Sequence, residues 1–229
     1  MADERFLVCG SRPWNRATFD EHLADLPGEW SFVAAKDDLT VERLEQLDPT
    51  AVFFLHWSWI VPADVVDRWA CVVFHMTDAP YGRGGSPLQN LIVRGHTSTV
   101  LTAMRMTAEV DAGPVYDKRP LDLSGTAESV YLRADRLSAA MIADWVAQRP
   151  EPVDQEGEVV AFDRRTPDQS EINEVTSLDE LFDLIRMLDA DGYPKAFLRH
   201  GGARFELSRA ARYDGELRAD VRITLDGGS

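Results

Sequence analysis

The chain has 229 residues and a formal net charge of -15, from 24 Lys and Arg against 39 Asp and Glu, and 45% of its residues are hydrophobic. That apolar fraction is ordinary for a soluble globular protein, whereas the acidic excess disfavours a nucleic-acid partner, because affinity for phosphate backbones depends mainly on Lys and Arg. No apolar run approaches the roughly 20 residues of a membrane-spanning helix, and the acidic start does not match a signal peptide, so we expect a cytoplasmic protein without a membrane partner.

The first third of the sequence alternates short apolar runs with amphipathic segments. The expected strands are 6–9, 30–35, 51–55 and 71–74, and the amphipathic segments between them are 19–26, 39–47 and 63–69. Such alternation indicates right-handed crossovers and a parallel sheet that is covered on both faces. Cys9 and Cys71 lie inside two of the apolar runs, so we expect both thiols to be buried and reduced.

The next part of the chain is expected to complete this domain. We predict a short helix over 86–94, strands over 99–106 and 114–121, and a helix over 128–148 with apolar residues at helical spacing. Pro150 and Pro152 prevent that helix from continuing. The predicted fold class is therefore α/β, with a Rossmann-like, open, mostly parallel sheet over residues 1–150.

A small α+β subdomain is expected over residues 151–229. Its predicted strands lie near 159–162, 196–199, 204–208 and 220–225. A helix is expected from about Ser177, because Ser177 and Glu180 have the spacing of a capping box.

Two apolar strands of the first domain lead into a histidine, His56 and His75. Ligands of open α/β sheets bind beyond the carboxyl ends of the strands, so both imidazoles are expected at the functional edge. His75 is followed by a loop with Pro80, Pro87 and several glycines, whose backbone a flat ligand can approach closely. A second candidate, Asp111, lies in an Asp-Ala-Gly turn between two predicted strands.

These motifs resemble the folate-dependent formyltransferases, a family that includes methionyl-tRNA formyltransferase, glycinamide ribonucleotide transformylase and the sugar N-formyltransferases. The pattern His-x-x-x-x-Pro-x-x-Arg-Gly-x-x-Pro, followed by Asp-Ala-Gly, is met by His75, Pro80, Arg83, Gly84, Pro87 and Asp111 to Gly113. The tail segments FDRRTPDQSEI and LFDLIRMLDADGYPKAF are similar to the region that follows the catalytic domain in sugar N-formyltransferases.

The resemblance implies formyl transfer from 10-formyltetrahydrofolate, as co-substrate, to a primary amine. His75 would donate to the formyl oxygen or to the leaving folate nitrogen, while Asp111 would keep the imidazole protonated and relay the amine proton. The expected folate-binding residues are Thr77, Pro80, Tyr81, Arg83, Gly84, Gly85 and Asp111. The expected substrate-binding residues are Arg12, Trp57 and Ser86, and no metal is expected.

One position departs from the family pattern. The family has Asn two residues before its histidine, where the amide holds the formyl oxygen, and this chain has Val73. An apolar side chain cannot donate that hydrogen bond, and loss of one such donor costs on the order of a hundredfold to a thousandfold in rate. We expect His56 to be the catalytic replacement, and a weakened or inactive protein is the opposite alternative. The other available donors are Thr77, Asn90, Trp57 and Trp59.

The predicted acceptor is a nucleotide-linked amino sugar. Only about 80 residues, many of them acidic, follow Pro150, whereas the tRNA enzymes of the family carry a longer basic domain there. The phosphates of a sugar nucleotide would bind Arg12, which follows the first predicted strand. A methionyl-tRNA formyltransferase-like activity, or transfer to another small amine, is the alternative within the family.

Two other classes of function remain open. One is a non-catalytic folate-binding module. The other is a metal-dependent hydrolase with His56, His75, Asp78 and Asp111 as ligands, although no His-x-x-x-His, His-Glu-x-x-His or Cys-x-x-Cys spacing is present. A homodimer is one alternative for the oligomeric state.

Overall fold

The computed structural model describes residues 4–225, which form two compact units. The first unit contains the chain up to Gly84, together with Thr99–Leu121 and Leu132–Ala161. The second contains Gly85–Ser98, Asp122–Tyr131 and the chain from Phe162 onward. The predicted division near residue 150 stays a prediction. Within the described residues no helix is both long and apolar enough to cross a membrane.

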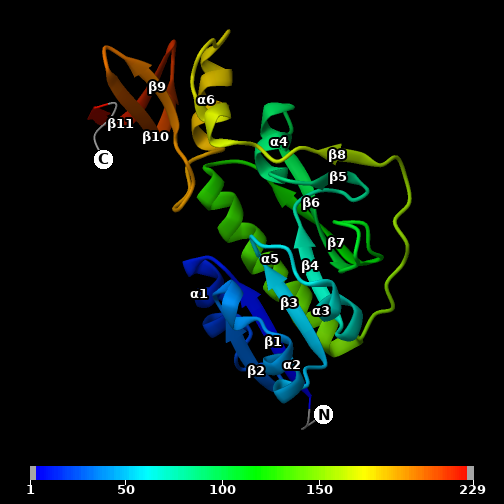
Figure 1. Cartoon of the computed structure of the whole chain (residues 1–229). Coiled ribbons are helices and arrows are strands. Elements are labelled where there is room, and N and C mark those ends of the chain that lie inside the picture. The colour runs from blue at the N-terminus through cyan, green and yellow to red at the C-terminus, as the bar shows by residue number, and fades with distance from the viewer. Residues whose placement is uncertain (1–3, 226–229) are drawn as a thin grey trace. The chain divides into compact units, whose positions relative to one another are not determined.

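A six-stranded sheet with the order β2-β1-β3-β4-β6-β7 forms the centre of the first unit (Figure 1). Its strands are β1 (Arg5–Gly10), β2 (Glu29–Val33), β3 (Ala51–Leu55), β4 (Cys71–His75), β6 (Ser98–Arg105) and β7 (Val115–Asp122). The pairs β1–β2, β1–β3 and β3–β4 are parallel, and β6 runs antiparallel to β4. The mostly parallel, Rossmann-like sheet is therefore confirmed.

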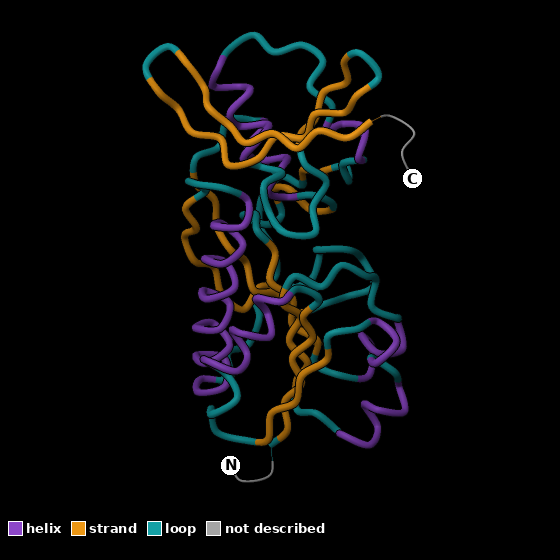
Figure 2. The backbone as a smooth tube through the Cα atoms, turned by 90° about the vertical axis from the view of Figure 1, so that its left-hand side faces the viewer, coloured by secondary structure: helices purple, strands orange, loops and turns teal. Residues whose placement is uncertain are grey.

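Helices cover both faces of this sheet, as Figure 2 shows. On one face lie α1 (Pro13–His22) and the part of α5 (Ala127–Gln148) that belongs to the first unit, joined by a 2.7 Å hydrogen bond from the Asn15 amide to the Asp135 carboxylate. On the other face, a buried cluster joins Leu44 of α2 (Val41–Leu47) and Val65 of α3 (Ala63–Arg68) to side chains of β1, β3 and β4. A short 3-10 helix, Lys36–Asp38, precedes α2.

The first helix begins earlier than the sequence pattern indicated. The amphipathic segment was expected over 19–26, but α1 runs from Pro13 to His22. Proline suits the first helical position because its φ is already helical and its missing N–H would have no partner there. The Arg12 backbone N–H also donates to the Asn15 side chain at 2.8 Å, which fixes the entry to the helix. The expected position of this helix was therefore wrong by several residues.

Alternation along β4 decides which face each of its side chains occupies. Cys71 and Val73 pack in the cluster with α2 and α3, whereas Val72 and Phe74 line a cavity against α5. Because successive side chains of a strand point to opposite faces, His75 lies on the α2 and α3 face, at the carboxyl end of β4. This is the edge at which the sequence placed it.

A two-stranded sheet follows β4. It pairs β5 (Tyr81–Gly84) with β8 (Val160–Phe162). The sequence predicted β8 but only a loop at β5. Glycine has a low β-propensity, so Gly82 and Gly84 gave no indication of a strand.

The second unit is built on a three-stranded antiparallel sheet of order β11-β10-β9. Its elements are α4 (Pro87–Val93), a 3-10 helix (Pro167–Ser170), α6 (Leu178–Arg186), β9 (Ala196–His200), β10 (Ala203–Tyr213) and β11 (Glu216–Leu225). Ser177 caps α6 by accepting the Glu180 N–H at 3.1 Å, as predicted. The Glu180 carboxylate, however, accepts from Thr176 rather than from Ser177.

Candidate active site

His75 and Asp111 meet in the first unit although 36 positions separate them in the sequence. The His75 Nδ1 atom lies 3.5 Å from Asp111 Oδ2, which is ion-pair distance when the imidazole is protonated. The side chains are 8% and 12% exposed, so water screens their interaction only weakly. The convergence expected from the motifs is thus found, while the catalytic roles stay predictions.

The turn that carries Asp111 has a backbone that few residues tolerate. Asp111 itself has a φ of +54°, in the left-handed region that Asp and Asn adopt more readily than most residues. A Cβ atom on Gly113 would lie 1.7 Å from the Arg105 carbonyl oxygen, so only glycine fits there. The Asp-Ala-Gly motif is therefore explained by the close approach of this turn to β6.

The loop after β4 supplies partners for both groups of the pair. The Gly84 N–H donates to Asp111 Oδ2 at 3.0 Å. The His75 Nε2 atom lies 2.8 Å from the Gly82 carbonyl oxygen, to which it donates when it carries a proton. Asp111 is thus held as a hydrogen-bond acceptor, and both imidazole nitrogens face a protein oxygen.

Gln155 is a site residue that sequence reasoning missed. Its Nε2 atom donates to the carbonyl oxygens of Asp111 and Gly113, at 2.9 and 2.8 Å. Its Oε1 atom accepts from Nε and Nη2 of Arg83, at 3.1 and 2.9 Å. Arg83 also pairs with Glu109 at 3.3 Å. One amide therefore ties the Asp111 turn to β5, and no sequence pattern marks it because its partners are distant in the chain.

Other expected folate-binding residues lie around the same loop. Thr77 is fully buried, and its hydroxyl donates to the Gly82 carbonyl at 3.4 Å. The Ala79–Pro80 peptide is cis, and the Pro80 carbonyl accepts from Val160 of β8. Tyr81 opens β5 and is half-buried. Thr77 and Pro80 therefore support the loop in this conformation.

Gly85, Ser86 and Asn90 belong to the second unit, and all three form hydrogen bonds within it. The Gly85 N–H donates to the Phe162 carbonyl, and the Ser86 hydroxyl accepts from the Arg165 N–H. The Asn90 amide donates to three carbonyl oxygens and accepts from Arg94. In this structure these polar groups order the start of α4.

His56 lies at the end of β3 beside the loop after β1. Its backbone carbonyl accepts from the Ser11 hydroxyl at 2.7 Å, and its ring packs edge-on against Trp14 at 5.8 Å. Burial, followed by the nearby Arg12 guanidinium, lowers the pKa of His56 to about 3. The imidazole is therefore neutral near pH 7 and can donate from only one nitrogen. Continuing the β3–β4 register beyond Phe54–Val73 brings His56 level with His75.

Trp57 contributes to an open cavity of about 360 Å³ beyond the ends of β2 and β3. Its ring packs edge-on against Trp59 at 4.8 Å and against Phe54 at 6.0 Å. Leu39, Val41, Ile60, Pro62 and Val65 supply the apolar lining, and Lys36, Asp37 and Asp64 supply charged groups. Trp57 is one of the predicted substrate-binding residues, so this cavity is a candidate acceptor pocket.

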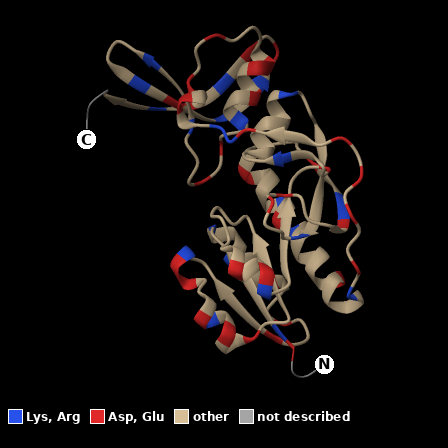
Figure 3. Ribbon diagram, turned by 45° about the vertical axis from the view of Figure 1, so that its right-hand side comes forward, with Lys and Arg blue, Asp and Glu red and all other residues tan. Residues whose placement is uncertain are grey.

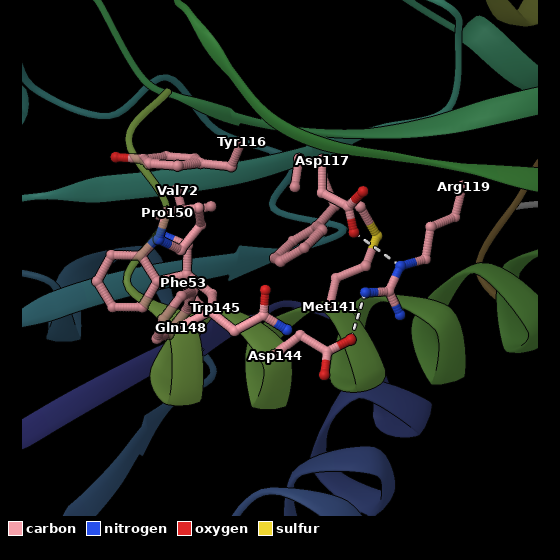
Figure 4. Close-up of a pocket in the computed structure, with 12 residues that line it drawn as sticks. Phe53, Val72, Tyr116, Asp117, Arg119, Met141, Asp144, Trp145, Gln148 and Pro150 are labelled. Atoms are coloured by element: carbon pink, nitrogen blue, oxygen red, sulfur yellow. Dashed lines mark hydrogen bonds and ion pairs between the residues drawn. The ribbon is translucent and has the colours of Figure 1, made fainter. Parts of the chain in front are cut away.

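A second cavity, of about 220 Å³, lies on the opposite face of the sheet from His75. Val72 and Phe74 of β4 line it, together with Met141 and Trp145 of α5. Figure 4 shows Val72, Met141 and Trp145 around this cavity. Figure 4 also shows Arg119 bridging Asp117 and Asp144, at 2.7 and 2.5 Å. The charged groups at this cavity are thus already paired within the chain. Among the described residues no three His, Cys, Asp or Glu side chains are close enough to hold a metal ion.

Comparison with known proteins identifies the family. A solved structure described as methionyl-tRNA formyltransferase from Clostridium thermocellum is 41% identical, with a TM-score of 0.92, over 97% of this chain and 99% of that one. The chain belongs to the formyltransferase family. The profile described as "Methionyl-tRNA formyltransferase, C-terminal domain" also matches residues 167–224.

More distant relatives limit the conclusions that can be drawn from sequence and structural similarity. A methionyl-tRNA formyltransferase of Francisella philomiragia is 25% identical over 84% of this chain, which spans only 64% of that protein. The chain is thus similar to less than two thirds of this longer curated relative. A sugar N-formyltransferase from a Shewanella species, at 15% identity and a TM-score of 0.72 over 92% of this chain and 98% of that one, has the same fold.

Proposed function

We propose that the protein transfers a formyl group from 10-formyltetrahydrofolate to a primary amine. The observation that carries the proposal is the buried His75–Asp111 pair at 3.5 Å, at the carboxyl end of a strand in a chain of the formyltransferase family. The acceptor nitrogen attacks the formyl carbon, the bond from that carbon to the folate nitrogen breaks, and one proton passes from the amine to the leaving nitrogen. No covalent bond to the protein is needed.

The two side chains divide the proton transfers. Asp111 accepts from the Gly84 N–H, and its Oδ2 atom lies 3.5 Å from His75 Nδ1, where it orients the imidazole and can relay the amine proton. His75 then donates to the formyl oxygen as negative charge develops, or to the leaving nitrogen. Because Nε2 faces the Gly82 carbonyl, this role requires the imidazole to exchange that partner for the substrate.

The leading candidate for the acceptor is the amino group of methionyl-tRNA. The 41% identical solved structure is described as a methionyl-tRNA formyltransferase, and the match covers 97% of this chain and 99% of that one. The chain also has a local basic segment: residues 195–225 hold seven Lys and Arg against four Asp and Glu, whereas the whole sequence is strongly acidic. Figure 3 shows blue bands, which mark Lys and Arg, on the C-terminal hairpin of β10 and β11. A polyanion would therefore meet its most favourable charge at this sheet.

A nucleotide-linked amino sugar is the second candidate. The overall charge of -15 favours it, because a strongly acidic chain repels a polyanionic acceptor such as tRNA. A sugar nucleotide carries only two phosphates, which Arg12 at the start of α1 could bind with few other basic residues.

The decisive experiment offers 10-formyltetrahydrofolate with each acceptor in turn. Release of tetrahydrofolate together with a mass increase of one formyl group on the acceptor identifies the substrate. Transfer to tRNA should fall steeply as salt rises, because several phosphates must be neutralised, whereas transfer to a sugar nucleotide should change little.

Variants of the site test the mechanism with the same assay. We expect His75→Ala and Asp111→Asn to reduce turnover by about three orders of magnitude or more, since each removes a proton-transfer partner. His22→Ala, at an exposed histidine of α1, is the matched control and should be fully active. Full activity in either site variant would refute the assignment, and no transfer to any amine would refute the proposed function.

A further inference from the structure

The cavity between β4 and α5 is a second pocket of the first unit, and the proposed formyl transfer does not use it. It holds about 220 Å³ and lies on the opposite face of the sheet from His75. All of the residues that line it belong to the first unit. Pockets for drug-sized ligands usually hold roughly 300–1,000 Å³, so this cavity suits a smaller molecule, about the size of a free amino acid.

Most of the lining is apolar or aromatic. Phe53, Val72 and Phe74 contribute to it from the sheet, and Met141 and Trp145 contribute from α5. Met141 and Trp145 are four positions apart, so they lie on the same side of the helix. Aromatic rings pack favourably edge-on or offset against other rings. The lining therefore favours a ligand that buries an aromatic ring.

One end of the cavity carries charged groups that can accept further partners. Arg119 uses Nε for Asp117 and Nη2 for Asp144, at 2.7 and 2.5 Å, which leaves Nη1 for another acceptor. The Asp117 and Asp144 side chains are 39% and 51% exposed, and such exposed pairs are individually weak. An α-amino acid matches this end, because its carboxylate can accept from Arg119 and its ammonium group can donate to Asp144.

Tyr116 and Trp145 lie at the other end of the cavity from Arg119, as Figure 4 shows. The Trp145 indole N–H is buried and has no hydrogen-bond partner of normal geometry in the described chain, although the Tyr116 hydroxyl is a polar neighbour. A buried donor without an acceptor is unfavourable, so an oxygen of the ligand would stabilise it. Three strand positions, about 10 Å, separate Tyr116 from Arg119, and this is about the length of a tyrosine molecule.

We propose that this cavity binds a free aromatic amino acid and prefers tyrosine. The ring packs against Phe74 and Met141, and the phenol oxygen accepts from the Trp145 indole. The carboxylate binds Arg119, and the ammonium group binds Asp144. Phenylalanine has the same ring but no acceptor for the indole N–H, whereas tyramine lacks the carboxylate. The site is on the other face of the sheet from the catalytic candidates, so the proposal does not depend on formyl transfer.

Isothermal titration calorimetry of the full chain with single ligands tests the chemistry of the site. L-Tyrosine should bind with a dissociation constant below about 1 mM, as expected for a small ligand with few polar contacts. L-Phenylalanine and tyramine should each bind at least about tenfold more weakly, because each lacks one of the polar partners. Absence of tyrosine binding, or binding of phenylalanine or tyramine as tight as that of tyrosine, overturns the proposal.

Two variants test whether the ligand lies in this cavity. Arg119→Gln should weaken tyrosine binding at least about tenfold, since it removes the charged partner of the carboxylate. Trp145→Phe should bind tyrosine and phenylalanine equally, because the N–H that distinguishes them is gone. Arg68→Gln, at an exposed arginine of α3 that pairs with Glu45, is the matched control and should bind tyrosine normally.

Circular dichroism shows whether each variant keeps the fold, and the Arg119→Gln result decides alone if Trp145→Phe does not fold. Undiminished tyrosine binding in folded Arg119→Gln, or a tyrosine preference that survives in folded Trp145→Phe, overturns the proposal.

Discussion

Replacing Gln155 with alanine should lower turnover without touching either predicted catalytic side chain. The Gln155 amide donates to the carbonyl oxygens of Asp111 and Gly113 and accepts twice from Arg83. Gln155→Ala removes these four hydrogen bonds, together with a weaker one to Met104 Sδ at 3.7 Å, and leaves Arg83 with Glu109 as its ion-pair partner. The turn then loses its link to β5, so Asp111 is no longer held at a fixed distance from His75.

The size of the effect follows from these contacts. At about 1 kcal/mol net for each of these four hydrogen bonds, the free energy of unfolding should fall by roughly 4 kcal/mol. A displacement of about 1 Å at a catalytic group costs on the order of a hundredfold in rate, so kcat should fall by about that factor. The acceptor KM should change little, because Gln155 does not lie in the Trp57 cavity.

A second substitution separates positioning from stability. Gln155→Glu keeps an acceptor for Arg83 but sets a carboxylate against the two carbonyl oxygens, so both donations are lost. It should therefore lose kcat much as Gln155→Ala does, while losing less stability. Single-turnover formyl transfer and urea unfolding measure the two quantities, with Gln148→Ala, at an exposed glutamine of α5, as the control. A normal kcat in Gln155→Ala would show that the turn holds Asp111 without the clamp.

Three further predictions follow from single side chains. Val73→Asn places an amide on the same face of β4 as His75 and should raise kcat at least about tenfold, as measured by steady-state formyl transfer. An unchanged kcat would mean that another group already donates a hydrogen bond to the formyl oxygen. Because the pKa of His56 is lowered to about 3, only the unfolded chain takes up this proton as the pH falls from about 6.5 to 3, and stability should decline by up to about 4 kcal/mol over that window. His56→Asn should remove this part of the decline in denaturant titrations at each pH, and an identical acid profile would contradict the assignment. Burial raises the pKa of Cys71 to about 12 and that of Cys9 well above its usual value, so mass spectrometry should find neither thiol alkylated at pH 8 until denaturant is added.

The central strands could be predicted from the sequence because of where they lie. All five residues of β3 are buried, since a strand inside a parallel sheet is covered on both faces. Such strands read as unbroken apolar runs, and β1, β3 and β4 were each located to within one residue on that basis. The meeting of His75 with Asp111 was inferred from the family pattern and not from these runs.

The C-terminal hairpin shows a signal that was present but unused. β10 and β11 extend to Tyr213 and Glu216, well beyond the predicted 204–208 and 220–225. The dipeptide Asp214-Gly215 between them is a typical two-residue hairpin turn. The alternation of Leu217 to Leu225 with charged residues also indicates a strand with one apolar face. Attention to short apolar runs located only part of each strand, because the charged residues of these strands interrupt the runs.

The prediction of site residues failed for a different reason. Gln155 is 44 positions from Asp111 and 72 from Arg83, and its neighbours in the sequence are acidic and exposed. A contact of this kind has no period and no spacing, because it depends only on how the folded segments meet. The same holds for Thr77 and Asn90, whose polar groups were offered as oxyanion donors but are engaged by backbone carbonyls.

Whether the acceptor is tRNA or a sugar nucleotide depends on how the local charge of the C-terminal sheet differs from the net charge of the chain. The electric field of a charged side chain is screened within about 8 Å at physiological salt. A phosphate that approaches the C-terminal sheet therefore responds to the charges of that sheet and not to those of the whole acidic chain. The arginines of that sheet are paired, however: Arg212 with Asp179, Arg218 with Glu216 and Arg222 with Glu206, at 2.9, 2.5 and 3.5 Å. These exposed pairs are individually weak, so phosphates can replace the carboxylates at modest cost. Asp179→Asn would leave Arg212 with only the longer contact to Asp183 at 3.9 Å. Binding of tRNA would therefore show a salt slope that steepens in this variant, whereas a sugar nucleotide held at Arg12 would not respond to that change.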